Sequence, residues 1–315
     1  MSAPTEEEVI DYFKSLSNWG RWGGDDRLGT LNLITPEVRK AAAGLVATGR
    51  VVSLSRDLDP EGRQDPLGSG IGSVKRFMGI NEVSHHMGEG YRVEAITESV
   101  FISAHGSNTH LDGLAHYAWD GQNYNGFDAQ KHNTSLGGAE KLSIHHASSG
   151  IVTRGVLLDI AGLKGVPWLE PGTAIYPDDL LAAEQRQGIT VRSGDALLIH
   201  TGHVARCLHE GPDPQGHQPG LNAACLPFLR ERDVAALGSD CIQDVQPSGY
   251  AAFDLLRPIH VVSLVALGLW LIDNMELTEL AATCAAEGRW EFFFAMLPWR
   301  LKGITSSATN PVAMF

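Results

Sequence analysis

Short apolar runs alternate with helical segments in the second half of the chain, and this alternation constrains the fold most strongly. The runs at 154–160, 194–202 and 235–240 read RGVLLDI, GDALLIHTG and AALGSD, and glycine or aspartate bounds each of them. Their length and apolar content are typical of buried strands. Between the first two lies YPDDLLAAEQRQG (176–188), with proline in its first turn and glycine at its stop. The pattern predicts an α/β or α+β fold.

Other segments extend this pattern toward both ends of the chain. The segment 35–50 predicts a helix with Thr35 as N-cap, Pro36 at the first helical position and Gly49 after its run of helix formers. ELTELAATCAAEG (276–288) predicts another helix, and RWEFFFAML (289–297) predicts a strand. The chain shows no internal repeat and no long polar linker. We therefore expect a single domain over residues 1–315.

The charge balance argues against two classes of partner. Lys and Arg number 24 against 37 Asp and Glu, which gives a formal net charge of −13. Such a surface repels nucleic acid and anionic lipid, so we expect neither as a partner. The longest apolar run, at 261–272, is well short of the roughly 20 residues that span a bilayer. The acidic N-terminal stretch lacks the pattern of a secretory signal, and we expect a soluble, cytoplasmic protein.

Two further features give no sign of a cofactor site. The glycine-rich segment 65–76 matches neither of the usual nucleotide-binding patterns, so we interpret it as a flexible loop. The cysteines lack the C-x-x-C spacing of a zinc site or redox centre and are interpreted as buried free thiols. They are Cys207, Cys225, Cys241 and Cys284.

The stretch HGSNTHLDGLAH (105–116) concentrates imidazole and carboxylate groups. His110 and Asp112 face the same way in an extended segment, and Asp112 approaches His116 across one helical turn. The turn-prone GSN link could fold His105 back toward His110. Imidazole nitrogen and carboxylate oxygen without thiolate suit Zn(II), Mn(II) or Fe(II). The stretch therefore predicts a site for a divalent metal ion.

The same stretch resembles the motif H-x-G-T-H-x-D-x-P-x-H of the cyclase-like metal-dependent hydrolase family, which includes arylformamidase, isatin hydrolase and a trans-dienelactone hydrolase. Blocks along most of the chain resemble family blocks in the expected order. They include GRWGGDDRLGTLNLIT, NYNGF, RGVLLDI, GDALLIHTG, GSDCIQDVQPSG, PIHVVSLVALGLWLIDN and NPVAMF. The resemblance implies a swivelling β/β/α-type fold with mixed sheets. It also implies a homo-oligomer, a dimer or tetramer, whose contacts complete the site.

The resemblance also implies roles for individual residues. His105, His110 and Asp112 match metal ligands, and Asp273 in LIDN stands where the family has a ligating glutamate. His116 corresponds either to a ligand of a second metal or to the catalytic histidine, and His260 in PIHVV to a histidine lining the site. Three positions depart from the family. His105 lies five residues before His110 where the family has four, Leu114 replaces the proline, and Asp273 is one methylene shorter than the glutamate.

These residues predict a hydrolase. A divalent metal ion, Mn or Zn, lowers the pKa of bound water and polarises a carbonyl oxygen, and His116 or His260 carries the proton. We expect a small-molecule substrate, namely a cyclic amide, a lactone or a formamide. Tyr117, Trp119 and Tyr124 lie near the motif and are candidates either for stacking on a planar substrate or for packing in the core. Asp240 and Asp244 either orient the site or belong to a strand-end turn.

Two alternatives use the same residues. His110, Asp112 and His260 also fit the 2-His-1-carboxylate triad of non-haem Fe(II) oxygenases. The segment after His260 has no Arg or Lys of the kind that oxoglutarate-dependent members carry. A non-catalytic metal-binding protein would keep the ligands but lose its proton carriers, and both His116 and His260 are present.

Overall fold

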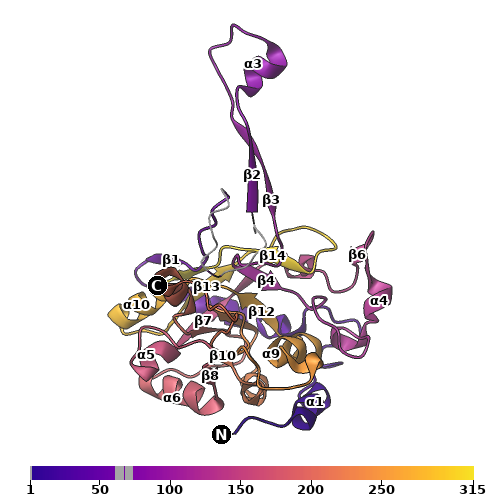
Figure 1. Cartoon of the computed structure of the whole chain (residues 1–315), viewed down its shortest axis with the longest axis vertical. Helices are drawn as coiled ribbons and strands as arrows, with labels where there is room; N and C mark the ends of the chain where they lie inside the picture. The colour runs from indigo at the N-terminus through magenta and orange to yellow at the C-terminus, as the bar shows by residue number, and fades with distance from the viewer. Residues whose placement is uncertain (1, 61–66, 68–73) are drawn as a thin grey trace.

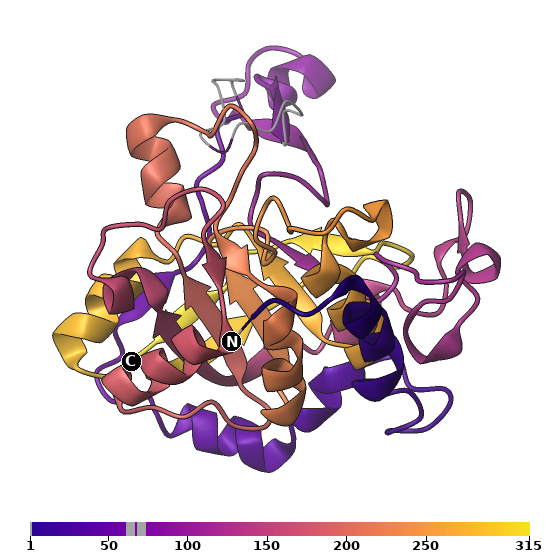
Figure 2. The ribbon, with the colours of Figure 1, turned by 60° about the horizontal axis from the view of Figure 1, so that its bottom comes forward.

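The computed structural model describes residues 2–60, 67 and 74–315, and its centre is a mixed sheet of nine strands (Figures 1 and 2). The strand order is β1-β15-β13-β7-β9-β11-β12-β4-β14. The strands are β1 (Val51–Ser53), β4 (His110–Asp112), β7 (Ile151–Asp159), β9 (Ala196–His200), β11 (Ala236–Ser239), β12 (Trp270–Asp273), β13 (Glu291–Met296), β14 (Ser306–Ala308) and β15 (Val312–Met314).

The centre of this sheet is parallel and its margins are antiparallel. Strands β7, β9, β11 and β12 run parallel, and β9, β11 and β12 are buried along their whole length. Strands buried on both faces read as continuous apolar runs, which is why these segments could be recognised. On one side, β13 pairs antiparallel with β7, and β15 pairs antiparallel with β13. On the other side, β4 pairs antiparallel with β12, and β14 pairs antiparallel with β4. The predicted mixed α+β architecture is confirmed.

Helices surround the sheet and join its strands (Figure 2). Helices α2 and α6 both contact β7, and α1 packs against α9. The α-helices are α1 (Glu6–Ser15), α2 (Pro36–Ala43), α3 (Glu82–Met87), α4 (Ala129–His132), α5 (Ile160–Lys164), α6 (Pro177–Gln187), α7 (His203–Glu210), α8 (Leu226–Glu231), α9 (Pro258–Val262) and α10 (Thr278–Glu287). Shorter turns are η1 (Gly29–Leu33), η2 (Tyr124–Gly126), η3 (Ile144–Ala147), η4 (Ala223–Cys225), η5 (Phe253–Leu255) and the π-helical η6 (Ser263–Leu267).

Most of the predicted helices and strands are confirmed, with one correction. α6 ends at Gly188 in the left-handed conformation, and α10 and β13 occupy the predicted segments 276–288 and 289–297. The helix predicted over 35–50 begins after Thr35 as expected but ends at Ala43. The amides of Thr48 and Gly49 donate instead to the carbonyl of Phe315, which draws this segment toward β1 and the C-terminus.

The apolar run at 261–272 is not one element. It contains the end of α9, the π-helical turn η6 and most of β12. Gly268 separates helix from strand with φ of +65°, and a Cβ there would lie 2.5 Å from the ring of Tyr124. A side chain at this position is therefore excluded by both backbone and space. No helix in the described ranges is long and apolar enough to cross a membrane.

A two-stranded arm projects from the body (Figure 1). It consists of β2 (Val74–Gly79), α3 and β3 (Thr97–Ile102), and its strands pair antiparallel from Val74 with Ile102 to Gly79 with Thr97. The glycine-rich segment 65–76 lies mostly outside the described residues, and its last three residues begin β2. Two further small sheets pair β5 (Asn133–Thr134) with β6 (Gly138–Ala139) and β8 (Ala174–Ile175) with β10 (Gly220–Leu221).

The four cysteines are buried and free, as predicted.

Candidate metal centre

Strand pairing brings the predicted ligands onto one face of the sheet. β4 lies between β12 and β14, and His110 lies opposite Asp273 on β12. Because side chains alternate along a strand, Asp112 shares the face of His110 while Leu111 points to the opposite face. His110, Asp112 and Asp273 are all buried. The extended geometry expected for His110 and Asp112 is therefore confirmed.

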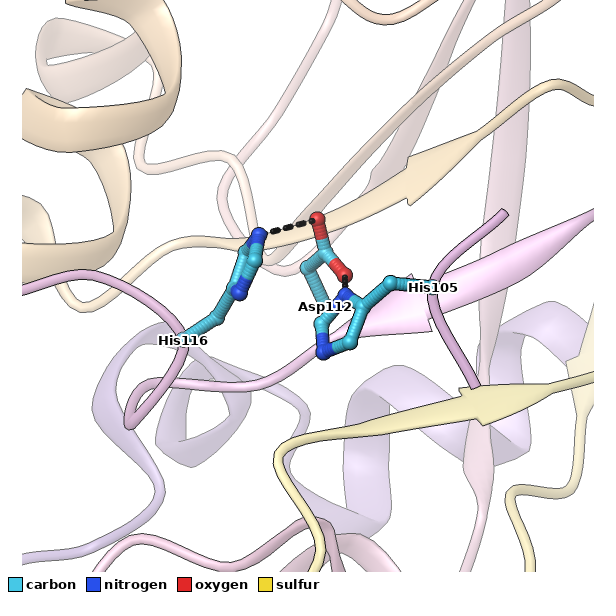
Figure 3. A group of neighbouring side chains, drawn as sticks. All are labelled: His105, Asp112 and His116. Carbon is cyan, nitrogen blue, oxygen red and sulfur yellow. Dashed lines mark ion pairs between the residues drawn. The ribbon is translucent and has the colours of Figure 1, made fainter. Parts of the chain in front are cut away.

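The segments on either side of β4 return two more histidines to Asp112. His105 Nδ1 lies 2.9 Å from Asp112 Oδ1, and His116 Nε2 lies 3.6 Å from Oδ2 (Figure 3). The rings of His105 and His116 stack at 4.0 Å. A hydrogen bond from the amide of His116 to the carbonyl of Gly113 forms the reversal, so this segment is a tight turn and not the predicted helical turn.

His260 reaches the same carboxylates from α9. Its Nε2 lies 3.1 Å from Asp273 Oδ2 and 3.7 Å from Asp112 Oδ2. Its Nδ1 donates to Asp244 Oδ2 at 2.5 Å, and Asp244 also accepts the backbone amides of Ile259 and His260. One carboxylate therefore holds both the start of α9 and the orientation of the His260 ring.

Further hydrogen bonds orient the remaining rings. His110 Nδ1 donates to the carbonyl of Asn108 at 2.7 Å, which leaves Nε2 as the nitrogen near Asp112. His105 Nε2 hydrogen-bonds with Thr305 Oγ1 at 2.9 Å, which leaves Nδ1 facing Asp112. Partners of this kind select the ring nitrogen that is available to a metal ion.

Asp273 has a support that the sequence did not suggest. Gln243 Nε2 donates to Asp273 Oδ1 at 3.2 Å and to the carbonyl of Ile272 at 2.8 Å. Gln243 is buried and has φ of +63°, a conformation that costs free energy in residues other than glycine. Because Asp273 Oδ1 accepts this bond, Asp273 Oδ2 is the oxygen that faces His260.

The electrostatics of the site centre on Asp112. Burial raises the pKa of Asp112, but His110 and the neighbouring histidines outweigh burial and hold that pKa well below its ordinary value. Burial lowers the pKa of His116 to about 4 against the opposite effect of Asp112, so His116 is neutral at pH 7. Burial also opposes charge on His260, but Asp273 and Asp244 raise the pKa of His260 well above its ordinary value.

The donor atoms fit a divalent metal ion. They form two groups, each with its atoms within 4.8 Å of one another: His105, Asp112 and His116, and His110, Asp112 and Asp273. Although His105 Nδ1 and Asp112 Oδ1 are close, both are buried without a hydrogen-bond partner. A cation bound between them would satisfy both atoms. Nitrogen and carboxylate oxygen are ligands that zinc, manganese and iron accept.

The site is open on one side. The His105 and His116 side chains are 33% and 25% exposed, whereas the Asp112 side chain is 2% exposed. Among the predicted aromatic residues, Tyr117 lies beside the site, with ring centroids 4.7 Å from His116 and 5.8 Å from His260. Access from solvent is therefore past His105, His116 and Tyr117.

Three other residues that the sequence analysis named as candidates lie outside this centre and make structural contacts. Trp119 stacks on Phe13 at 4.2 Å, and Tyr124 is buried with its hydroxyl donating to Asp26. Asp240 accepts hydrogen bonds from the backbone at the start of α7. The structure thus brings together all six residues predicted for the site, and their individual roles stay predictions. They are His105, His110, Asp112, His116, His260 and Asp273.

Comparison with known proteins adds evidence from outside the chain. The model of a family described as putative cyclase matches residues 37–243. A crystal structure described as a novel cyclase is 30% identical, with 100% of both chains covered and a TM-score of 0.84.

Isatin hydrolase A from Labrenzia aggregata is 18% identical over 88% of this chain and 96% of its own, with a TM-score of 0.53. Isatin hydrolase A from Ralstonia solanacearum is 19% identical over 89% and 97%, with a TM-score of 0.55. These two show likeness of fold. The comparison with curated proteins finds no match.

Proposed function

Since the chain belongs to the putative cyclase family, we propose that it is a metal-dependent hydrolase acting on a small cyclic amide, a lactone or a formamide. The observation that supports this most is the membership of Asp112 in both groups of donor atoms. The fold of the chain is shared with two isatin hydrolases, and isatin is itself a cyclic amide. The same chemistry, addition of water to a carbonyl group, covers all three substrate classes.

We assign the binding of zinc or manganese to His105, His110, Asp112 and Asp273. When bound, such an ion lowers the pKa of water toward 7 and polarises a carbonyl oxygen. Asp112 and Asp273 supply the negative charge, and the hydrogen bonds of His105 and His110 to Thr305 and Asn108 fix the ring orientations. The low pKa of Asp112 keeps its carboxylate ionised over the whole working pH range.

We assign proton transfer to His116. Its ring lies at the exposed side of the centre and is neutral at pH 7, so it can accept a proton from water and return it to the leaving nitrogen or oxygen. The side chain of His260 is 1% exposed and is held between Asp244 and Asp273. Its position suits it to orienting the carboxylates more than to contacting solvent.

Metal content measured by mass spectrometry, together with a hydrolysis assay, tests this proposal. Wild type is compared with His110→Ala, and His209→Ala serves as control because His209 is an exposed histidine on α7. We expect near-stoichiometric zinc or manganese in wild type and in the control, and little in His110→Ala. The assay uses an aromatic lactam, a lactone and an N-formyl arylamine, and we expect turnover of at least one without O₂.

Other results point elsewhere. Bound iron with substrate-dependent O₂ consumption would support the oxygenase alternative built on His110, Asp112 and His260. Bound metal without turnover of any of the three substrate classes would support a binding protein. Wild type that takes up no metal after reconstitution would refute the proposed metal centre.

A further inference from the structure

Asn274 is the first residue after β12 and follows Asp273 directly. It is 5% exposed and has φ of +55°, in the left-handed region that asparagine adopts more readily than most residues. Such a conformation costs free energy and is kept where the surrounding structure holds it. The contacts that hold Asn274 lie in the segments that carry the proposed metal ligands.

Two of these contacts are with the link between His105 and His110. The side chain of Asn274 donates from Nδ2 to the carbonyl of Gly106 at 3.0 Å, directly after His105. The carbonyl of Asn274 accepts a hydrogen bond from Thr109 Oγ1 at 2.7 Å, directly before His110. Asn274 therefore holds both ends of this link.

The position of Asn274 also joins the two groups of donor atoms. His105 belongs to one group and Asp273 to the other. Asn274 is bonded covalently to Asp273 and contacts the residue after His105 through its side chain. Its amide donates to the carbonyl of Cys241 at 3.0 Å, in the loop that continues to Asp244. The three segments that build the centre therefore meet at one residue.

The segment that carries His105 depends on hydrogen bonds of this kind. Residues 103–109 all lie in the described part of the chain, and none of them belongs to a helix or strand. The His105 side chain is also 33% exposed, so packing restrains it only in part. Donors from distant parts of the chain hold the carbonyl groups of the segment instead. They are Ser306 Oγ for Ala104, Asn274 Nδ2 for Gly106, Arg56 Nη1 for Ser107 and the amide of Thr309 for Thr109.

We propose that Asn274 is a positioning residue that holds His105 against Asp112 through the carbonyl of Gly106. A metal ion accepts its ligands only within about 0.2 Å of their ordinary distances, so a small shift of the His105 backbone would weaken binding. The proposal rests on the metal centre of the proposed function, but it does not depend on the reaction that the centre carries out.

Competition with a chelator tests the proposal by measuring the affinity for the ion that wild type retains, zinc or manganese. Glycine adopts the left-handed conformation without strain, so Asn274→Gly removes the bond to Gly106 and preserves the backbone. We expect metal binding to weaken by roughly 10- to 100-fold. Asn81→Gly is the matched control and should bind like wild type. Asn81 has φ of +56°, is exposed on the arm and makes no capping bond with its side chain.

The possible results separate the two proposals. Wild type that binds neither ion would refute the metal centre, and the role of Asn274 with it. Equal affinity in wild type and Asn274→Gly would overturn the role of Asn274 alone.

A double-mutant cycle with His105→Ala distinguishes positioning from a general structural role. If Asn274 acts through His105, Asn274→Gly should weaken metal binding by less than about 3-fold when residue 105 is already alanine. The same loss of affinity in both backgrounds would mean that Asn274 acts on another part of the centre, and it would overturn the proposal.

Hydrogen exchange measured by mass spectrometry gives a readout on the metal-free protein. We expect residues 103–109 to exchange faster in Asn274→Gly than in wild type, and the buried strand β9 to exchange at the same rate in both. Asn274→Asp, whose carboxylate cannot donate to the carbonyl of Gly106, should show the same change and is the second variant if the glycine variant does not fold. Unchanged exchange over 103–109 in a folded variant would overturn the proposal.

Discussion

The strand β4 and the arm are separated by a few residues of chain, yet their stability has different sources. β4 is paired on both sides and all three of its residues are buried. Among the described residues, β2 and β3 pair only with each other, and their side chains are exposed. The metal centre is therefore fixed by the protein's own core, whereas the strands of the arm pair, among the described residues, with each other alone.

The largest effect is expected from Asp112→Asn. Asp112 contributes to both groups of donor atoms, so its loss should lower turnover by more than the roughly 10- to 100-fold typical of removing a supporting residue. Metal content should fall in parallel. Glu98→Gln, which neutralises a carboxylate on the arm, should retain wild-type values in both assays. Retention of metal and turnover by Asp112→Asn would remove the distinction between the two regions.

Truncation in the two regions should affect folding stability differently. Leu111→Ala removes a fully buried side chain from the face of β4 opposite the ligands, and we expect a loss of about 2–5 kcal/mol in the free energy of unfolding. Val100→Ala on the exposed arm should change the free energy of unfolding by less than about 0.5 kcal/mol. Urea unfolding provides both values. Equal losses would mean that the arm is packed within the single chain.

Asp244→Asn tests the support of the metal centre. The asparagine lacks the charge that helps to raise the pKa of His260 and does not select the same ring nitrogen, so we expect kcat/KM to fall by about 10- to 100-fold. The pH profile of kcat/KM should also move. Asp240→Asn is the control from the same loop, because its carboxylate binds the start of α7. Asp240→Asn should lower folding stability and leave the pH profile of kcat/KM unchanged. An unchanged pH profile in Asp244→Asn would contradict the role of Asp244 in supporting His260.

The smallest expected effect is the pH dependence of folding stability that comes from the ion pair of His200 with Asp159. His200 Nδ1 lies 2.8 Å from Asp159 Oδ1. Burial lowers the pKa of His200, but the bond to Asp159 and the charge of Asp240 outweigh it, and the net pKa lies above the ordinary 6.5. The stabilisation is therefore complete below pH 6.5 and is lost as pH rises through the folded-state pKa.

Asp159 has a lowered pKa: burial opposes its ionisation, and the bond from His200 outweighs burial. Its contribution is present above its ordinary pKa of 3.8 and is lost in stronger acid. Urea unfolding at pH 6 and pH 8.5 should show a larger loss of stability for wild type than for His200→Gln. The same loss in both proteins would contradict the pair's contribution.

Much of the fold and of the centre could be predicted because the responsible signals are local. Buried parallel strands such as β9 read as apolar runs, and α6 carries its proline and glycine at the two ends. His110 and Asp112 share a face because a strand has a period of two. These inferences need no knowledge of distant parts of the chain.

The remainder depends on long-range pairing. Gln243 and Asp244 join the centre only because β11 lies beside β12 and β12 beside β4, an order that the sequence does not reveal. Helix α2 ends at Ala43, and the segment after it donates hydrogen bonds from Thr48 and Gly49 to Phe315, at the other end of the chain. The arm was not predicted, because no residue from Val74 to Ile102 is buried and its apolar residues therefore show no alternating burial pattern.

The short connection between the arm and the centre has a consequence for enzymology. β3 ends at Ile102, and His105 follows three residues later. Anything that immobilises the base of the arm also restricts the segment that carries His105. Turnover and metal content measured after a change in the arm would therefore report on the position of His105 as well as on the arm itself.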